Sequence, residues 1–483
     1  MSTNGLNRRV GGFSPPLPHI RNACFLPIFE KRGIRRRGLV INRAQAASVQ
    51  LVRFLYCDHS GVTRGKAIHV SHLEHKLREG LGLTRAQMAM NLLEQLIDIE
   101  GMEPVGEIRL VPDPETFSVL PWTPSSASLI CDQLDHNHLN WGSCPRSFLK
   151  DMVARAEHMG ISVEATFENE FYLASKRDGT YIPFDQAPVY SSIGLDLSAQ
   201  IMHDIVKALG EQDLIVEQAI NEYGPGQQEI SVRHAPGVRA ADNQIKLRDT
   251  VRGVALNHGL LASFAPKPFP EEIGSGCHIH LSLWDQEGRR NLLFDSQDPR
   301  GLSQFGRHFI AGVLDHLPAL TALTCPSYNS YRRLQPHMWS SAYTAWGFDN
   351  REGAVRVVSP FWGREEQTYN IELKSVDGSA NPYIALGGLI AAGLDGITRQ
   401  LDPGGPCEHD PGKLSEAERE RHRIRRLPTT MAAALDELER DQLLMEAMGD
   451  LMRRSYLAVR RSEEKAFAEQ DLDFEIRNHF YKF

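Results

Sequence analysis

Alternating apolar and polar residues predict strands in the first part of the chain. β-Branched and aromatic residues dominate positions 49–56 and return at 67–70, and turn-forming residues at 58–61 separate the two runs. This arrangement predicts a β-hairpin. A further strand is expected at 107–111, where a proline-rich turn ends it. The pattern therefore predicts a small α+β unit over residues 46–142.

The rest of the chain mixes helical spacing with more alternating strands. Apolar residues recur at helical spacing in 147–158, and residues 430–470 are rich in Ala, Leu, Glu and Arg, as is typical of helices. Residues 401–428 are rich in proline, glycine and charged residues, which indicates a surface loop. We find neither a repeat of fixed period nor a glycine-rich nucleotide-binding loop. The pattern therefore predicts strands and helices that alternate irregularly through the rest of the chain.

Composition narrows the function classes. With 483 residues, 41% of them hydrophobic and 24% charged, the chain can bury a large core without disulfides. Its longest nearly uncharged apolar run, 383–394, is too short to span a bilayer. Seven cysteines without a CxxC pair indicate reduced thiols, and the net charge of −8 gives no sign of nucleic-acid binding. We expect a cytoplasmic protein with neither membrane nor nucleic-acid partners.

Residues 1–45 differ from the rest in their charge. They hold nine Lys or Arg against one acidic residue, Glu30. This composition is typical of a disordered tail, although a transit peptide or a start codon placed too far upstream would look the same. We expect a basic, disordered tail and leave it out of the fold.

Four of the expected strands carry ionisable residues two positions apart, which puts them on one face of a strand. Each strand alone is typical of the wet face of an antiparallel sheet. Together they offer carboxylates and imidazole without a thiolate, a donor set that favours Mg²⁺ or Mn²⁺. The residues are Glu168 and Glu170; Glu222 and Glu229, on either side of a turn at 224–226; His278, His280 and Ser282; and Glu372 and Lys374.

A basic set follows these acids in the sequence. Guanidinium groups match carboxylates and phosphates through paired hydrogen bonds. Combined with divalent metals and carboxylates, they are the components of phosphoryl transfer from a nucleotide. The alternative is ordinary surface charge, which is favoured for the Arg332-Arg333 pair taken alone. The set comprises Arg332, Arg333, Arg351, Arg356 and Lys374.

In their order and spacing these motifs resemble the glutamine synthetase superfamily over residues 48–483. The chain is type I-like and closest in character to the γ-glutamylamide and γ-glutamylpolyamine synthetases. The matching segments are Glu168-Asn-Glu170-Phe171, the Glu222 and Glu229 pair around Gly-Pro-Gly-Gln, residues 267–282 and 329–334, Asn350-Arg351, and Ala380-Asn-Pro-Tyr383.

The resemblance implies a fold and an assembly. It implies an α+β protein with an N-terminal β-grasp domain over 46–142, followed by a catalytic domain over 143–483 with a curved antiparallel sheet and packed helices. It also implies a homo-oligomer, usually a dodecamer of two stacked hexameric rings, with each active site at a subunit boundary.

The resemblance also implies a role for each matching residue, with ATP as a substrate and two or more Mg²⁺ or Mn²⁺ ions per site. One metal would be held by Glu170, Glu222 and Glu229, and the other by Glu168, His278 and Glu372. His280, Ser282 and Arg356 would contact ATP. Arg333, Gly274, Lys374 and Trp339 would line the substrate site, Arg351 would hold the transferring phosphoryl group, and Asp58 would take a proton in the neighbouring subunit's site.

Three departures affect the substrate site. Trp339 stands where the family has a flap glutamate that helps bind ammonium, Ile273 replaces an asparagine, and Lys374 replaces an arginine. An indole removes a partner for ammonium and supplies an apolar wall for a substituted amine. We therefore expect an ATP-dependent ligase that phosphorylates the γ-carboxylate of glutamate and forms a γ-glutamylamide. The alternatives are an ordinary glutamine synthetase that uses ammonia, and a non-catalytic structural or signalling relative.

Overall fold

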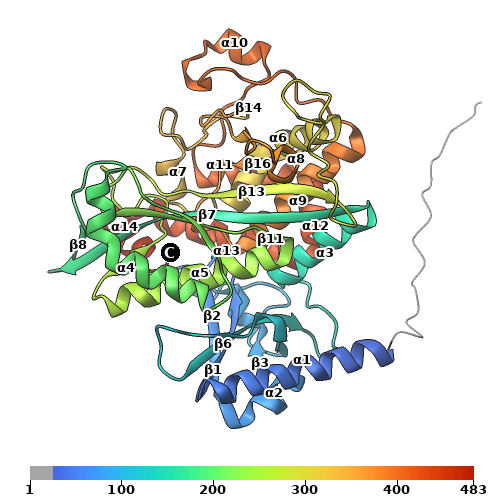
Figure 1. Cartoon of the computed structure of the whole chain (residues 1–483), viewed down its shortest axis with the longest axis vertical. Helices are drawn as coiled ribbons and strands as arrows, with labels where there is room; N and C mark the ends of the chain where they lie inside the picture. Colours follow the sequence, from blue (N-terminus) through green and yellow to red (C-terminus); the bar gives the residue numbers. More distant parts are fainter. Residues whose placement is uncertain (1–25) are drawn as a thin grey trace, which may run out of the picture.

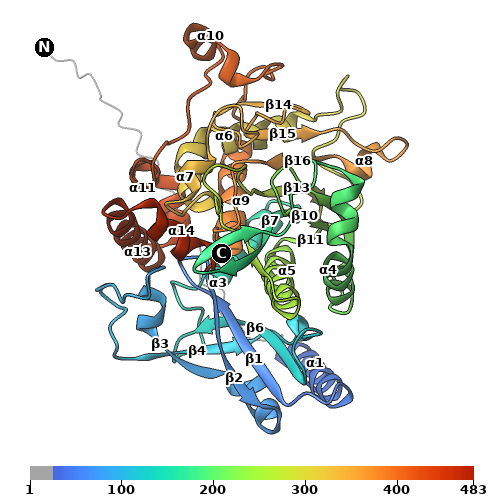
Figure 2. The ribbon, with the colours of Figure 1, turned by 90° about the vertical axis from the view of Figure 1, so that its left-hand side faces the viewer.

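Two β-sheets organise residues 26–483, the part of the chain that this computed structural model describes (Figures 1 and 2). The smaller sheet has the order β2-β1-β6-β4-β3, with β5 paired to β6. β1 and β2 form the predicted antiparallel hairpin, and β1 runs parallel to β6. The strands are β1 (Leu51–Cys57), β2 (Thr63–His69), β3 (Leu81–Thr84), β4 (Glu107–Pro112), β5 (Ser118–Val119) and β6 (Ser126–Leu134).

A helix occupies residues 26–45 of the expected tail. α1 (Leu26–Ala46) lies along the outer side of the small sheet, where Val40 and Ala44 are 2% and 0% exposed (Figure 1). The prediction of a disordered tail is therefore wrong for residues 26–45. Val40 and Ala44 stand four apart, so they share one face of a helix and bury apolar surface that the net charge of the segment does not reveal. Residues 1–25 lie outside the described residues.

The larger sheet has the order β14-β15-β16-β13-β7-β10-β9, with β8, β11 and β12 also paired to β7. Its pairings are antiparallel apart from β14 and β15, which run parallel. The predicted α+β class is confirmed. The strands are β7 (Ile161–Arg177), β8 (Thr180–Pro183), β9 (Val216–Asn221), β10 (Gln227–Val232), β11 (Ala235–Pro236), β12 (Leu261–Ser263), β13 (Cys277–Asp285), β14 (Trp346–Phe348), β15 (Val355–Val358) and β16 (Asn370–Leu373).

Helices cover one face of the large sheet, and the ionisable side chains of its strands lie on the other face. Phe167 of β7, Ile279 and Leu281 of β13 and Ile371 of β16 belong to one core cluster with α3 (Pro145–His158), α6 (Gln304–Thr324) and α9 (Pro382–Arg399). Because strand residues alternate between faces, the neighbouring glutamates and histidines point to the opposite side. A second cluster packs α4 (Ser192–Gly210) and α5 (Gly237–Asn257) against the far half of β7 and β10.

The Ala380-Asn-Pro-Tyr383 motif forms the start of α9. Asn381 caps the helix, because its side-chain oxygen accepts the backbone N–H groups of Tyr383 (3.0 Å) and Ile384 (3.3 Å). Its amide nitrogen donates to the backbone carbonyl of Asp58 at 2.9 Å. Asn381 therefore fixes the hairpin turn of the small sheet against the domain that contains the large sheet.

The end of the chain is helical, as predicted, and one expected loop contains a short helix. α10 (Glu416–Arg421) lies inside the 401–428 segment and begins with a capping box at Ser415. Among the described residues, no helix is long and apolar enough to cross a membrane. The remaining helices are α2 (Leu73–Glu79), α7 (Ser330–Arg333), α8 (Glu365–Thr368), α11 (Met431–Arg440), α12 (Gln442–Met448), α13 (Asp450–Ala468) and α14 (Leu472–Phe480).

Candidate active site

Strand register brings the predicted ligands together on the open face of the large sheet. His278 stands opposite Glu168, and His280 stands opposite Glu372. On the other side of β7, Glu229 stands opposite Glu170. Directly opposite residues of antiparallel strands share a face and lie within side-chain reach of each other. Residues from four distant parts of the sequence therefore form one cluster.

Four of these side chains are in direct contact. The Nδ1 atom of His278 lies 3.1 Å from Glu168 Oε2 and 3.3 Å from Glu372 Oε1, and the Nε2 atom of His280 lies 3.7 Å and 3.9 Å from the same two oxygens. One ligand atom each from Glu168, His280 and Glu372 lie within 4.8 Å of one another. The geometry thus makes His280 a candidate metal ligand alongside His278, whereas the resemblance assigns it to ATP.

The neighbouring carboxylates are crowded by like charges. Burial, followed by the charges of Glu168 and Glu170, raises the pKa of Glu229 to about 10. Burial and the charge of Glu170 likewise raise the pKa of Glu222 to about 7. Divalent cations would relieve this repulsion, and oxygen with imidazole donors suits Mg²⁺ or Mn²⁺. The donor set therefore fits the metals that the sequence predicts.

Glu170 is held in place from two sides. It accepts the backbone N–H of Gly276 at 2.8 Å and the side-chain amide of Gln227 at 3.4 Å. The same amide of Gln227 donates to the carbonyl of Gly274 at 3.1 Å. These bonds fix the 274–276 segment beside the cluster.

Two cationic side chains, Arg356 and Lys374, neutralise the charge of Glu372. Its carboxylate is 1% exposed and lies 2.9 Å from Arg356 Nε and 3.2 Å from Lys374 Nζ. Burial alone would raise its pKa, but Lys374, the two histidines and Arg356 lower it to about 2. Lys374, expected to line the substrate site, thus pairs with a candidate metal ligand in the single chain.

Arg333 and Gly274 lie next to each other at one edge of the cluster. The Arg333 guanidinium is buried, donates to the carbonyl of Val376 at 3.1 Å and comes within 3.4 Å of His278 Nε2. A Cβ atom at position 274 would lie 2.7 Å from Arg333 Cγ, so only glycine allows this approach. Arg333 is therefore close enough to serve a substrate bound at the metals.

The histidine and serine expected at ATP are oriented by their neighbours. His280 Nδ1 lies 2.9 Å from the side-chain oxygen of Asn370. Ser282 accepts a hydrogen bond from the indole N–H of Trp284 at 2.9 Å. Its hydroxyl hydrogen remains free to donate to a ligand.

Trp339 and Arg351 line a separate cleft of about 330 Å³, together with residues 348–350 and 407–410. The Trp339 side chain is 54% exposed, and its backbone N–H donates to Glu352 Oε1 at 3.0 Å. Glu352 is the site residue that the sequence analysis missed. Its position directly after Arg351 was the available signal, because an acid bonded to the Trp339 backbone can replace the negative charge of the family's flap glutamate.

Asp58 does not reach the cluster within one chain. It lies at the end of β1 with no exposed surface, 2.5 Å from Arg64 Nε, and it also accepts the backbone N–H of Val62 at 2.9 Å. The role expected for Asp58 therefore depends on a second copy of the chain.

Two family models cover nearly all of this chain. The glutamine synthetase catalytic domain matches residues 142–479, and the glutamine synthetase N-terminal domain matches residues 36–145. The chain belongs to the glutamine synthetase family. It is therefore a ligase of glutamate with ammonia or an amine, from a family that uses ATP and divalent metals.

The similar proteins include both a glutamine synthetase and a gamma-glutamylpolyamine synthetase. The chain is 34% identical to a glutamine synthetase of Halobacterium salinarum, an alignment that covers 92% of this chain and 96% of the relative. It is also 34% identical to gamma-glutamylpolyamine synthetase GlnA3 of Streptomyces coelicolor, over 88% of this chain and 93% of the relative. A solved GmaS/ADP complex aligns with a TM-score of 0.79 and 29% identity, covering 91% of this chain and 98% of that one.

Proposed function

We propose that this family member transfers the γ-glutamyl group of glutamate to an amine rather than to ammonia. The observation that carries the proposal is Trp339, an exposed indole in the cleft beside Arg351. The similarity to a γ-glutamylpolyamine synthetase supports it, while the equal similarity to a glutamine synthetase keeps ammonia as the competing acceptor.

The proposed reaction has two steps. An oxygen of the γ-carboxylate attacks the terminal phosphorus of ATP, and ADP leaves. The amine nitrogen then attacks the acyl phosphate carbon, inorganic phosphate leaves, and the nitrogen loses a proton to a base. Arg333 would bind the α-carboxylate, Arg351 would neutralise the transferring phosphoryl group, and Asp58 of a second copy would accept the proton.

The phosphate end of this site would be built by the cluster on the large sheet. Glu168, His278 and Glu372 would hold one divalent metal, and Glu170, Glu222 and Glu229 the other. These metals would neutralise phosphate charge during the transfer. Ser282 and Arg356 would contact ATP beside them, with His280 available to either partner.

Trp339 favours an amine that carries carbon. Burying ~100 Å² of apolar amine surface against the indole at ~25 cal/mol/Å² is worth roughly 2.5 kcal/mol, or about 70-fold in affinity. Glu352, bonded to the Trp339 backbone, would supply the negative charge that a protonated amine needs before it reacts. The indole and the carboxylate together would select an alkylammonium ion over the smaller ammonium ion.

An amine panel tests the proposal. We expect kcat/KM for the best alkyl- or arylamine to exceed that for ammonia, and Trp339→Ala to reduce the ratio by about tenfold or more, because it removes the apolar wall. Phosphate release measures both values. Trp362, fully exposed on another loop, supplies the control substitution Trp362→Ala, which should leave the ratio unchanged.

The ordinary synthetase is the second candidate, and Glu352 is the observation that favours it. If Glu352 fully replaces the flap carboxylate, ammonia will outperform every amine in the panel. Glu352→Gln would then raise the KM for ammonia, and Trp339→Ala would leave the preference for ammonia intact. That result would overturn the γ-glutamylamide proposal.

A further inference from the structure

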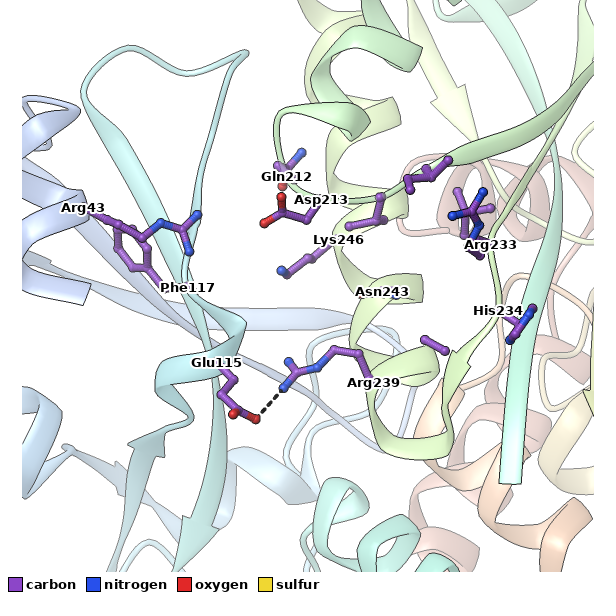
Figure 3. Close-up of a pocket in the computed structure, with 14 residues that line it drawn as sticks. Arg43, Glu115, Phe117, Gln212, Asp213, Arg233, His234, Arg239, Asn243 and Lys246 are labelled. Carbon is purple, nitrogen blue, oxygen red and sulfur yellow. Dashed lines mark hydrogen bonds and ion pairs between the residues drawn. The ribbon is translucent and has the colours of Figure 1, made fainter. Parts of the chain in front are cut away.

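A second cavity lies between the two domains, away from the metal cluster. Its volume is about 300 Å³, at the lower end of the range for small-molecule sites (Figure 3). None of the seven candidate metal ligands, His280 included, lines it. The walls are Arg43 of α1, Glu115 and Phe117 of the small domain, the turn at 212–215, residues 232–235, and Arg239, Asn243 and Lys246 of α5.

Two of the cations in this cavity have no acidic partner. Counting only residues that the structure describes, neither Arg43 nor Lys246 has a carboxylate oxygen within 4.0 Å. The Arg43 guanidinium lies over the ring of Phe117, 5.3 Å from its centre. Figure 3 shows Arg43 and Lys246 extending into the space from opposite walls.

The other two cations are already neutralised. Arg239 pairs with Glu115 at 3.3 Å and with Asp242 at 3.2 Å, while Arg233 pairs with Glu217 at 3.0 Å. Asp213, in the turn at 212–215 that also lines the cavity, is exposed to solvent. With the single negative charge of Asp213 counted against the two unpaired cations, the cavity keeps a net positive charge, carried by Arg43 and Lys246.

The surroundings of Lys246 disfavour its charged form. Burial, followed by the charge of Arg239, lowers its pKa to about 8, while Asp242 and Asp213 act in the opposite direction and Arg43 adds to the lowering. A half-buried ammonium without a partner is unfavourable, and an anion beside it would restore its charged form.

We infer that this cavity binds a small carboxylate or phosphate compound, with Lys246 and Arg43 as its direct ligands. Arg43 belongs to the helix on the small domain, and Lys246 belongs to α5 of the catalytic domain. The ligand would therefore connect the two domains, and binding should stabilise the folded chain. This site is independent of the proposed acceptor, because it shares no residue with the Trp339 cleft or the metal cluster.

Titration of the whole chain with inorganic phosphate, and separately with citrate, tests the inference and distinguishes phosphate from carboxylate. At least one probe should bind more weakly to Lys246→Met than to the unmodified chain by about tenfold or more, the scale of one lost charge-assisted hydrogen bond. Arg43→Met should have a similar effect from the other wall. Lys207→Met, on the exposed side of α4, is the matched control and should not change binding.

The active site can also bind phosphate, so the readout is the difference between variants in the presence of saturating ADP and Mg²⁺. A second measurement does not depend on how well a variant folds. In the reductively methylated, unmutated chain, the NMR signal of Lys246 should titrate near pH 8 and shift upward by about one unit when the binding probe is added. Equal binding by wild type and Lys246→Met for both probes, or a Lys246 titration that neither probe changes, would overturn the inference.

Discussion

At the residue scale, Glu229 shows how single carboxylates depend on the cluster around them. It lies opposite Glu170 in the strand pairing and is buried among carboxylates that raise its pKa. A group in this setting gains most from a cation, because the metal offsets both the burial and the repulsion.

Replacing Glu229 with Ala should therefore remove both activity and metal-linked stability. We expect Mg²⁺-dependent turnover to fall by ~10²-fold or more, the scale of losing one electrostatic stabiliser, and Glu170→Ala to behave in the same way. Mg²⁺ should also raise the melting temperature of the unmodified chain more than that of Glu229→Ala. Glu217→Ala, in the same hairpin but exposed and paired with Arg233, is the control. Unchanged turnover in Glu229→Ala or Glu170→Ala would refute the assignment of these ligands.

At the element scale, His316 connects three helices of the catalytic domain. It belongs to α6, its Nε2 lies 3.1 Å from Asp395 of α9, and its Nδ1 lies 2.6 Å from Asp441, the residue that caps α12. Burial alone would lower the pKa of His316, but hydrogen bonds to the two aspartates raise it above its ordinary value. The protonated imidazole therefore stabilises this helix junction.

The sign of this effect gives a pH prediction. Because the folded pKa is above the unfolded value, the stabilisation is complete below about pH 6.5 and is lost as the pH rises through the folded pKa. The unmodified chain should lose about 1–2 kcal/mol more unfolding free energy than His316→Gln between pH 6 and pH 9. Denaturant midpoints at the two pH values measure this. His308→Gln, on the same helix, is the control, because the ring of His308 contacts the carbonyl of Leu401 and the side chain of Gln304 and no carboxylate. Parallel pH curves for all three chains would contradict the prediction.

The strands show which features the sequence could predict. Glu168, Glu170, His278 and His280 could be assigned to faces, because a strand places every second residue on one side. Their register could not be predicted, since the pairing of His280 with Glu372 joins segments that are 92 residues apart. The contact between Trp339 and Glu352 depends on loop conformation, to which no periodicity applies. Charge alone misassigned α1, because its buried face consists of only a few apolar residues.

At the scale of the whole molecule, the turn that carries Asp58 is fixed to the catalytic domain of its own chain. Asn381 donates to the carbonyl of Asp58, and a Cβ atom at Gly61 would lie 2.2 Å from the carbonyl oxygen of Ser379. Arg146 strengthens the same junction, because its guanidinium bonds Asp113 and Asp132 of the small domain and Asp242 of α5. The two domains of one chain therefore hold Asp58 in a fixed position, and a second copy that used Asp58 would have to dock to that position.

This fixed placement makes the proposed ring assembly testable. Asp58→Ala and Arg351→Ala should each inactivate the enzyme, because one loses the base and the other the phosphoryl contact. If every site takes Asp58 from one chain and Arg351 from its neighbour, a site in a mixed ring is complete when an Arg351→Ala chain supplies Asp58 to an Asp58→Ala chain. Random mixing in equal amounts should then restore about a quarter of the normal activity, because one boundary in four has that order in a cyclic assembly.

Co-expression with two different tags, followed by purification on both, isolates the hybrids, and mass measurement verifies that rings of both chains have formed. Each variant co-assembled with itself under a second tag is the control and should stay inactive. Verified hybrids that remain inactive would show that Asp58 and Arg351 act within one chain. The ion pair between Asp58 and Arg64 would then have to open inside the protomer to supply the base, which Arg64→Met would reveal as a change in the pH dependence of turnover.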